Sequence, residues 1–158
     1  MAELKPGKAA PAFQLEDASG EKVSLKDFKG QWIVLYFYPR DNTPGCTKEA
    51  CEFTSGVRAF KKMDATVFGI SPDSPESHRK FADKYKLKVG LLSDPKRTVL
   101  KKYGAWGKKN MYGKITEGVI RSTVLIAPDG KIAHHWPKVK AAGHAEKVRE
   151  KLAELRAS

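Results

Sequence analysis

Apolar positions along the chain fall in short continuous runs, and segments with helical spacing lie between them. The runs 32–38, 66–70 and 89–92 have the length and composition of buried strands. Segment 44–62 predicts a helix with one apolar face, and segment 71–87 opens with a turn containing two prolines and then predicts a second helix. Strands that alternate with helices in this way are typical of parallel crossover units. The apolar face of the first helix is formed by Ala50, Phe53, Val57 and Phe60.

Short elements precede this central block. Two strand candidates, Phe13–Leu15 and Val23–Leu25, flank a turn signal at 17–20, and residues 26–30 read as one helical turn closed by a glycine. We therefore expect an N-terminal hairpin packed on the main sheet.

The second half of the chain predicts a further helix, a hairpin and a closing helix. The helix at 94–103 is stopped by Gly104. Strands at 119–127 and 131–136 flank a Pro-Asp-Gly turn, which favours an antiparallel hairpin. The amphipathic segment 143–155 is expected to pack its apolar side on that sheet.

Residues 104–118 are rich in glycine and aromatic residues and carry no clear period, so they are expected to form a long loop. Long loops in compact domains are often functional. An ordered structural connection is an equally good interpretation, and the residues do not decide between the two.

Crossover units followed by an antiparallel hairpin and a helix predict an α/β, thioredoxin-like fold. The expected architecture is a central mixed β-sheet flanked by helices, with the N-terminal hairpin as an extension. With 158 residues, 41% of them hydrophobic, the chain has the size of one compact domain with its own core. We expect a single domain over residues 1–158.

Composition indicates in which cellular compartment the protein is found. The first residues carry no apolar run of the kind found in export signals, and no apolar run approaches the length of a membrane span. The chain has two cysteines, close together in sequence, which suits a reactive thiol pair in a reducing compartment better than a structural disulfide. These features predict a cytoplasmic protein without a membrane segment.

The net charge of +12 is unevenly distributed, because residues 1–60 are neutral in sum and residues 61–158 carry the whole surplus. Solvated helix faces are the simplest interpretation. A nucleic-acid surface is disfavoured because the basic residues are scattered and no recognised binding motif is present. Electrostatic steering of an acidic partner protein is the remaining interpretation.

Both cysteines lie where the central strand passes into the first long helix. Thr43 suits the N-cap position, and Pro44 suits the first helical position because the N–H that it lacks would have no intrahelical partner. Cys46 then falls in the first turn. Unpaired backbone N–H groups and the positive end of the helix dipole favour an anion there, so this thiol should ionise more readily than a free one.

Cys51 lies five residues further along the same helix. Helix geometry places the two Cα atoms roughly 8.6 Å apart. A disulfide needs Cα atoms within about 7 Å, so the pair cannot bond while the helix is intact. Gly45, Thr47 and the proline start make this first turn weak by propensity, which suits a segment that opens and reforms.

The pattern Pro39-x-x-x-Thr43-x-x-Cys46 resembles the peroxidatic signature of peroxiredoxins. The wider run 36–51, including the four-residue gap between the cysteines, is similar to the bacterioferritin comigratory protein, or peroxiredoxin Q, branch, whose resolving cysteine lies in the same chain. The resemblance covers essentially the whole chain and implies the thioredoxin-like fold. Further landmarks are Gly69-Ile-Ser, Leu92-Ser-Asp, Gly104-x-Trp-Gly and Arg121-Ser-Thr.

The resemblance implies a role for each of five residues. Cys46 is the peroxidatic nucleophile, and Cys51 is the resolving thiol that forms an intramolecular disulfide with it. Arg121 stands where the family carries its active-site arginine, whose guanidinium can stabilise both the thiolate and the developing charge on the peroxide. The Thr43 hydroxyl is close enough in sequence to reach the sulfur or the peroxide, and Pro39 would shield the sulfur from water.

The implied reaction is the reduction of hydrogen peroxide and organic hydroperoxides, as part of antioxidant defence and redox homeostasis. The expected partners are hydroperoxide substrates and thioredoxin, or glutaredoxin, as the reductant. No cofactor or metal is expected, and an intrachain resolving thiol removes any chemical need for a dimer, so we expect a monomer.

Other functions fit the residues less well. A zinc site needs ligands beyond the two thiols, and the four histidines, His78, His134, His135 and His144, do not have finger spacing. The Cys-x-x-Cys motif of a thioredoxin-type oxidoreductase is absent. The non-enzymatic alternative is a basic, redox-responsive binding or chaperone-like domain that uses the same cysteines.

Overall fold

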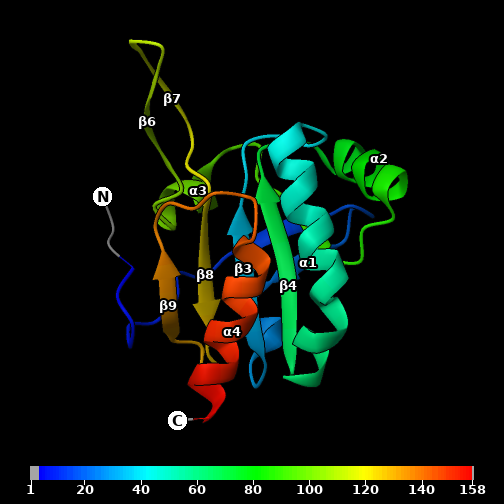
Figure 1. Ribbon diagram of the computed structural model, residues 1–158, viewed down its shortest axis with the longest axis vertical. Coiled ribbons are helices and arrows are strands. Elements are labelled where there is room, and N and C mark those ends of the chain that lie inside the picture. The colour runs from blue at the N-terminus through cyan, green and yellow to red at the C-terminus, as the bar shows by residue number, and fades with distance from the viewer. Residues whose placement is uncertain (1–3, 158) are drawn as a thin grey trace.

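A mixed seven-stranded sheet with helices on both faces forms the body of the computed structural model, which describes residues 4–157; the ends of the predicted domain 1–158 lie outside them (Figure 1). Its strands are β1 (Gln14–Asp17), β2 (Lys22–Ser24), β3 (Trp32–Phe37), β4 (Ala65–Ser71), β5 (Gly90–Ser93), β8 (Ser122–Ile126) and β9 (Ile132–Trp136). The helices are α1 (Pro44–Lys62), α2 (Pro75–Tyr85), α3 (Thr98–Lys102) and α4 (His144–Ala157), with a 3-10 turn, η1 (Leu25–Phe28). The order across the sheet is β2-β1-β5-β4-β3-β8-β9, which confirms the predicted α/β class and mixed sheet.

The strand β3 lies inside the sheet and determines where the two halves of the chain meet. It pairs in parallel with β4 and antiparallel with β8, in a register that places Phe37 opposite Ser122. Because the pairing with β8 is antiparallel, the carboxyl end of β3 lies beside the amino end of β8. Residues that follow β3 and residues that precede β8 are therefore neighbours in space, although about eighty positions separate them.

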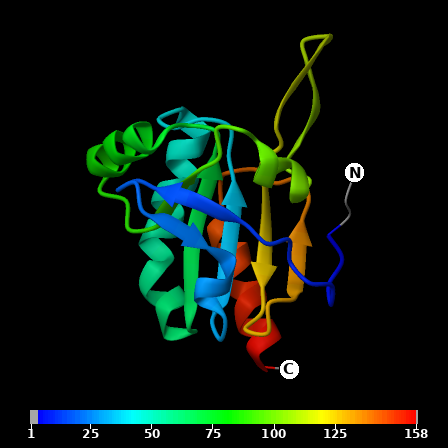
Figure 2. The same cartoon turned by 180° about the vertical axis from the view of Figure 1, so that it is seen from behind.

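Alternate side chains of β3 enter two separate cores, as the period of a strand requires. Val34 and Tyr36 pack with residues of α1, α2 and α4 on one face. Ile33, Leu35 and Phe37 pack on the other face with residues of α3 and of the N-terminal segment, which crosses that face in Figure 2. Burial of β3 on both sides explains why its sequence is continuously apolar rather than alternating.

The predicted N-terminal hairpin is present and extends the sheet. β1 pairs antiparallel with β2 and also with β5, so the hairpin adds two strands at that edge. The turn between its strands is held by the Asp17 carboxylate, which accepts hydrogen bonds from the backbone N–H groups of Ser19 and Glu21.

The prediction of a loop over residues 104–118 is wrong. Residues of this segment form a second, two-stranded antiparallel sheet, β6 (Trp106–Met111) and β7 (Lys114–Val119), which projects from the body of the molecule (Figure 1). Its two central turn residues, Tyr112 and Gly113, have φ values of 55° and 82°. Positive φ at both positions defines the tight turn that suits the twist of a hairpin. The usual sequence signal for such a turn is Asn-Gly. The sequence here is Tyr-Gly, which does not predict a hairpin turn.

The predicted strand 119–127 is interrupted at Ile120 and Arg121. The N–H of Ile120 donates to the Ala105 carbonyl over 2.7 Å, and the carbonyl of Arg121 accepts from the N–H of Val139 over 2.9 Å. These bonds to other segments remove both residues from the ladder, and the Arg121 side chain is free to turn toward α1.

Two predicted helices are shorter than the sequence pattern indicated. α2 ends at Tyr85, because Lys86 adopts a left-handed φ of 52°, and α3 begins only at Thr98, after Arg97 at φ 62°. Within residues 4–157, no helix is both long enough and apolar enough to cross a membrane.

The close approach of β3 and β4 predicts an unequal response to two glycine substitutions. A Cβ on Gly69 would lie 2.6 Å from Cζ of Tyr36, which is fully buried and stacks on Phe53 with ring centroids 4.6 Å apart. We expect Gly69→Ala to lower the free energy of unfolding by about 2 kcal/mol, because the ring must move inside a packed core. Gly56→Ala in α1 is the control: its Cβ would meet only an ordinary 3.5 Å contact, so improved helix propensity should raise stability by up to about 1 kcal/mol. Urea unfolding of both variants checks this, and equal stabilities would contradict it.

Candidate active site

The cysteine of the first helical turn lies at the carboxyl end of β3. Pro44 is the first residue of α1, as predicted, and Cys46 is the third. The side chain of Cys46 is buried, with 1% of its surface exposed. Its sulfur thus lies near the amino end of a 19-residue helix, where backbone N–H groups and the helix dipole favour negative charge.

The loop before α1 holds the other two residues predicted from the signature. Thr43 occupies the N-cap position with extended backbone angles, but its side chain makes no cap hydrogen bond, which corrects that part of the prediction. The hydroxyl donates instead to the Arg40 carbonyl over 3.0 Å, so it is directed toward the loop rather than the helix. Pro39 is half-buried, two residues after the end of β3.

Arg121 reaches the sulfur from the amino end of β8. Its Nη2 donates to Sγ of Cys46 over 3.2 Å, and its side chain is only 17% exposed. A guanidinium at this distance stabilises the thiolate over the thiol. Burial alone would lower the pKa of Arg121, but the negative charges of Glu49 and Cys46 outweigh it and raise that pKa. The guanidinium is therefore a permanent positive charge at the site.

Glu49 is a member of this site that the sequence did not reveal. Its Oε1 accepts from Nη1 of Arg121 over 2.6 Å, and its side chain is completely buried. Its Oε2 has no hydrogen-bond partner among the described residues. Burial raises the pKa of Glu49 to about 7, although the charge and hydrogen bond of Arg121 act in the opposite direction. One feature of the sequence could have indicated its role: Glu49 lies three residues after Cys46, and this spacing places both side chains on one helix face.

Cys51 lies on the same unbroken helix and is half-buried against the core that α1 shares with the sheet. Both cysteines are free thiols in this structure. The continuous helix keeps their Cα atoms roughly 8.6 Å apart, beyond the reach of a disulfide. In this structure the helix is therefore closed and the two sulfurs are not bonded to each other.

Lys109 of the projecting hairpin is a further cation near the sulfur. Its stem lies against the backbone of Gly118, where a Cβ would be 3.6 Å from Cδ of the lysine. Partial burial lowers the pKa of Lys109, the nearby charge of Arg121 lowers it further, and Cys46 acts in the opposite direction. The hairpin thus brings a second positive group within electrostatic range of the reactive sulfur.

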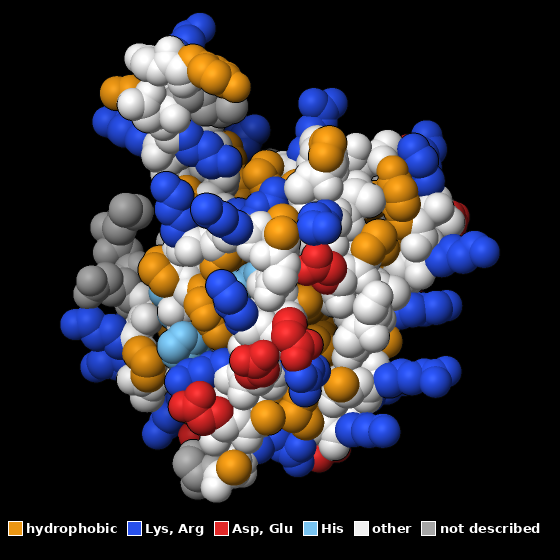
Figure 3. Space-filling model, viewed as in Figure 1, with side chains coloured by type: hydrophobic (Ala, Val, Ile, Leu, Met, Phe, Trp, Pro, Cys, Tyr) orange, Lys and Arg blue, Asp and Glu red, His pale blue; other side chains and the backbone are white. Residues whose placement is uncertain are grey.

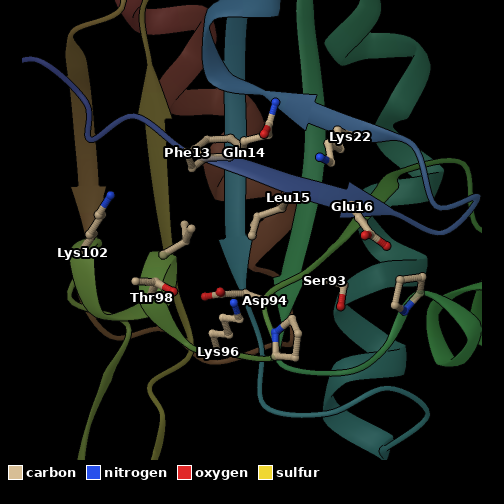
Figure 4. A pocket seen from close by; sticks show the side chains of 13 residues that line it. Phe13, Gln14, Leu15, Glu16, Lys22, Ser93, Asp94, Lys96, Thr98 and Lys102 are labelled. Carbon is tan, nitrogen blue, oxygen red and sulfur yellow. The ribbon is translucent and has the colours of Figure 1, made fainter.

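A hollow of about 430 Å³ lies elsewhere on the molecule (Figure 4). Phe13, Glu16 and Lys22 line it from the N-terminal hairpin, and Ser93 and Asp94 line it from β5 and the residue after it. Its lining contains neither cysteine nor Arg121. The chemistry therefore belongs to the junction of β3 and α1, and not to this hollow.

A guanidinium fixed beside a buried thiol in the first turn of a helix is the environment that a nucleophilic cysteine requires. The model of the AhpC/TSA family matches residues 6–135, and the chain belongs to this family. It is a peroxiredoxin, so the peroxidase interpretation is confirmed, and its substrates are peroxides that it reduces at the expense of a thiol reductant.

Individual relatives and solved structures show which members of the family the chain resembles. A Mycobacterium tuberculosis protein is 50% identical over 149 residues, which cover 94% of this chain and 95% of its own length. Peroxiredoxin Bcp of Bacillus subtilis is 42% identical over 152 residues, covering 96% and 97%. A cysteine-to-serine mutant of Xylella fastidiosa PrxQ superposes with a TM-score of 0.91 at 36% identity over the whole of both chains.

The Xanthomonas campestris bacterioferritin comigratory protein, described for its alkyl peroxide reduction activity, superposes with a TM-score of 0.88 at 36% identity, covering 95% of this chain and 98% of its own. These matches confirm both the thioredoxin-like fold and the resemblance to the bacterioferritin comigratory protein and peroxiredoxin Q branch.

Burial of Glu49 predicts a pH-dependent stability. The carboxyl pKa is about 4.5 in a free side chain and about 7 in the folded protein, so the folded state holds the proton more tightly. The stability gained from this proton is fully present below pH 4.5 and is lost as the pH rises through about 7. One pKa unit is worth about 1.4 kcal/mol. As the pH rises from 4.5 to above 7, we therefore expect the free energy of unfolding of the wild type to fall by about 3 kcal/mol relative to that of Glu49→Gln.

Urea unfolding at a series of pH values measures this difference. Glu76→Gln is the control, because the Glu76 side chain is 72% exposed and should leave the pH profile unchanged. A Glu49→Gln profile parallel to that of the wild type would show that the carboxyl does not titrate in this range.

Proposed function

We propose that Cys46 reduces hydroperoxides by direct attack on the peroxide bond. The thiolate attacks the distal oxygen, the O–O bond breaks, and the alkoxide or hydroxide leaves and takes up a proton. Cys46 becomes a sulfenic acid. The observation that carries this proposal is the 3.2 Å contact between Arg121 Nη2 and Sγ, because it supplies a fixed positive charge beside both the nucleophile and the oxygen on which charge develops.

We assign supporting roles to the two loop residues. Pro39, half-buried after β3, excludes water from the sulfur. The Thr43 hydroxyl donates to the Arg40 carbonyl in the structure, and rotation about its side chain would let it bind a peroxide oxygen. Both assignments rest on position and on the family signature.

Cys51 then resolves the sulfenic acid. Its sulfur attacks Sγ of Cys46, a disulfide forms within the chain, and water leaves with the sulfenic oxygen. Because the closed helix separates the two Cα atoms by roughly 8.6 Å, the first turns of α1 must open before this bond can form. The enzyme therefore alternates between a closed reduced form and a locally unwound oxidised form.

A protein dithiol, thioredoxin or alternatively glutaredoxin, resets the enzyme by thiol–disulfide exchange. Lys109 of the projecting hairpin lies within electrostatic range of the sulfur, Lys108 and Lys114 lie on the same hairpin, and Figure 3 shows Lys and Arg side chains gathered at its base. This surface favours a reductant with an acidic face.

The expected location of the enzyme is the cytoplasm, where such dithiols are maintained in the reduced state. Because the disulfide forms within one chain, the enzyme can act as a monomer.

Peroxide treatment of the reduced protein tests the proposal directly. One equivalent should produce a Cys46–Cys51 disulfide within a single chain, with a loss of helical circular dichroism as the start of α1 unwinds. Mass spectrometry of peptides under non-reducing conditions identifies the linkage, and Cys46→Ser is the control that should form none. Intermolecular linkage alone, or an intrachain disulfide with unchanged helicity, would contradict the mechanism.

The two cysteines should also differ in steady-state assays. With thioredoxin, its reductase and a nicotinamide cofactor, Cys46→Ser should consume no peroxide. Cys51→Ser should complete one turnover and then accumulate sulfinic acid at Cys46, because no second thiol intercepts the sulfenic acid. Steady turnover of Cys51→Ser at the wild-type rate would remove the resolving role from Cys51.

A further inference from the structure

A buried group of polar side chains lies directly before the segment that must unwind. The Asp41 carboxylate accepts three hydrogen bonds, from Tyr38 Oη over 2.6 Å, from Ser77 Oγ over 2.8 Å and from His78 Nδ1 over 2.8 Å. The backbone N–H of Asp41 donates to Asp73 Oδ2 over 2.8 Å. One residue of the loop is thus fixed by four bonds, three of which reach more than thirty positions along the chain.

His78 is the centre of this group and has no exposed surface. Its Nδ1 faces the Asp41 carboxylate, and its Nε2 lies 3.0 Å from the Leu92 carbonyl. A carboxylate and a carbonyl only accept hydrogen bonds, so each ring nitrogen faces an acceptor oxygen. The ring therefore connects the loop before α1 to α2 and to the carboxyl end of β5.

The other end of the unwinding segment is fixed by packing. Phe53 is completely buried and stacks on Tyr36 of β3, with ring centroids 4.6 Å apart. Glu52 Oε1 accepts from the N–H of Gly143 over 2.8 Å, which ties α1 to the start of α4. Both cysteines lie between this point and Asp41.

Between the two fixed points, the segment 42–51 begins with a weakly held residue, whereas Cys46 and Glu49 further along it are bonded to the Arg121 guanidinium. Asn42 follows Asp41 directly, is exposed, and has a left-handed φ of 60°, a conformation that asparagine tolerates at chain reversals. Its side chain accepts one exposed hydrogen bond, from Tyr85 Oη. The chain direction thus changes at the residue where the strong bonding ends.

We propose that the Asp41–His78 pair anchors the loop, confines redox unwinding to residues 42–51, and thereby sets the balance between disulfide formation and over-oxidation of Cys46. The inference rests on the proposed Cys46–Cys51 disulfide. In the closed form, a second peroxide can transfer an oxygen to the sulfenic acid, giving sulfinic acid and an alcohol or water. In the open form, Cys51 reaches the sulfur first. A firmer anchor favours the closed form and makes the enzyme more sensitive to inactivation by peroxide.

Substitution of His78 tests the anchor. His78→Leu removes both ring hydrogen bonds, and the opening equilibrium of residues 42–51 should rise about tenfold. The peroxide concentration that inactivates half of the enzyme should rise by the same factor, while the rate of the first oxidation of Cys46 changes little. Hydrogen exchange in the oxidised protein should extend from residues 42–51 into residues 38–41.

Two further variants separate the anchor from general stability. His78→Asn retains a donor close to the position of Nδ1, so its inactivation concentration should return to within about threefold of the wild type. Tyr103→Phe is the matched control: it removes a part-buried hydrogen bond, from Tyr103 Oη to the Pro11 carbonyl, and Tyr103 belongs to the core on the other face of the sheet. It should lower the midpoint of urea unfolding without changing the inactivation concentration.

Ser77→Ala replaces His78→Leu if that variant does not fold. It removes one hydrogen bond to Asp41 and should raise the inactivation concentration two- to threefold, by the same argument.

The outcomes are distinguishable. A wild-type enzyme that forms no Cys46–Cys51 disulfide would refute the proposed function itself. A wild type that forms the disulfide, with a His78→Leu or Ser77→Ala variant that keeps the wild-type inactivation concentration and protection of residues 38–41, would overturn the anchor. An equal shift in Tyr103→Phe would also overturn it, because general destabilisation would then explain the effect.

Discussion

The interaction on which this active site depends is the contact of one guanidinium with two buried acidic groups. Arg121 donates to Cys46 from one terminal nitrogen and to Glu49 from the other. A thiolate removed from water is costly unless a positive charge is fixed beside it, and a lone arginine on a strand end could rotate away. The Glu49 carboxyl group holds the guanidinium in place, although it is buried and its second oxygen has no hydrogen-bond partner within residues 4–157. Reactivity at the sulfur is therefore maintained by a charge arrangement that does not maximise stability.

The same helix has to be rigid at one end and able to open at the other. Its later turns carry Phe53 and Phe60, both fully buried in the core beneath α1. Its first turn begins with Pro44 and Gly45 and places no comparable apolar side chain in that core. Local stability follows the density of buried contacts, so the helix is expected to open from its amino end. The chemistry requires opening at that same end, because both cysteines lie there.

Most of the fold follows from local patterns in the sequence, and most of the site follows from the resemblance of one stretch. The strands β3, β4 and β5 and the helix α1 are visible as apolar runs and as a helical stripe. The hairpin of β6 and β7 is not, because its strands are mostly exposed and bury side chains only at their base, and because its turn uses Tyr112 in a conformation rare for that residue type. The bonds of Glu49 to Arg121 and of Asp41 to His78 are not visible in the sequence for another reason: the partners are distant along the chain, and only the packing of the sheet brings them together.

Gly45 shows why the start of α1 cannot be optimised for helix stability alone. A Cβ on this residue would lie 3.2 Å from Arg121 Nη2, closer than ordinary contacts, so a side chain here would require the guanidinium to shift by a few tenths of an ångström. Glycine also costs a helix about 1 kcal/mol relative to alanine, which weakens the turn that must open. One residue thus meets two requirements that arise at different stages of the cycle: room for the arginine when the site is closed, and a low barrier when the helix unwinds. A substitution that strengthened the helix at this position would act against both.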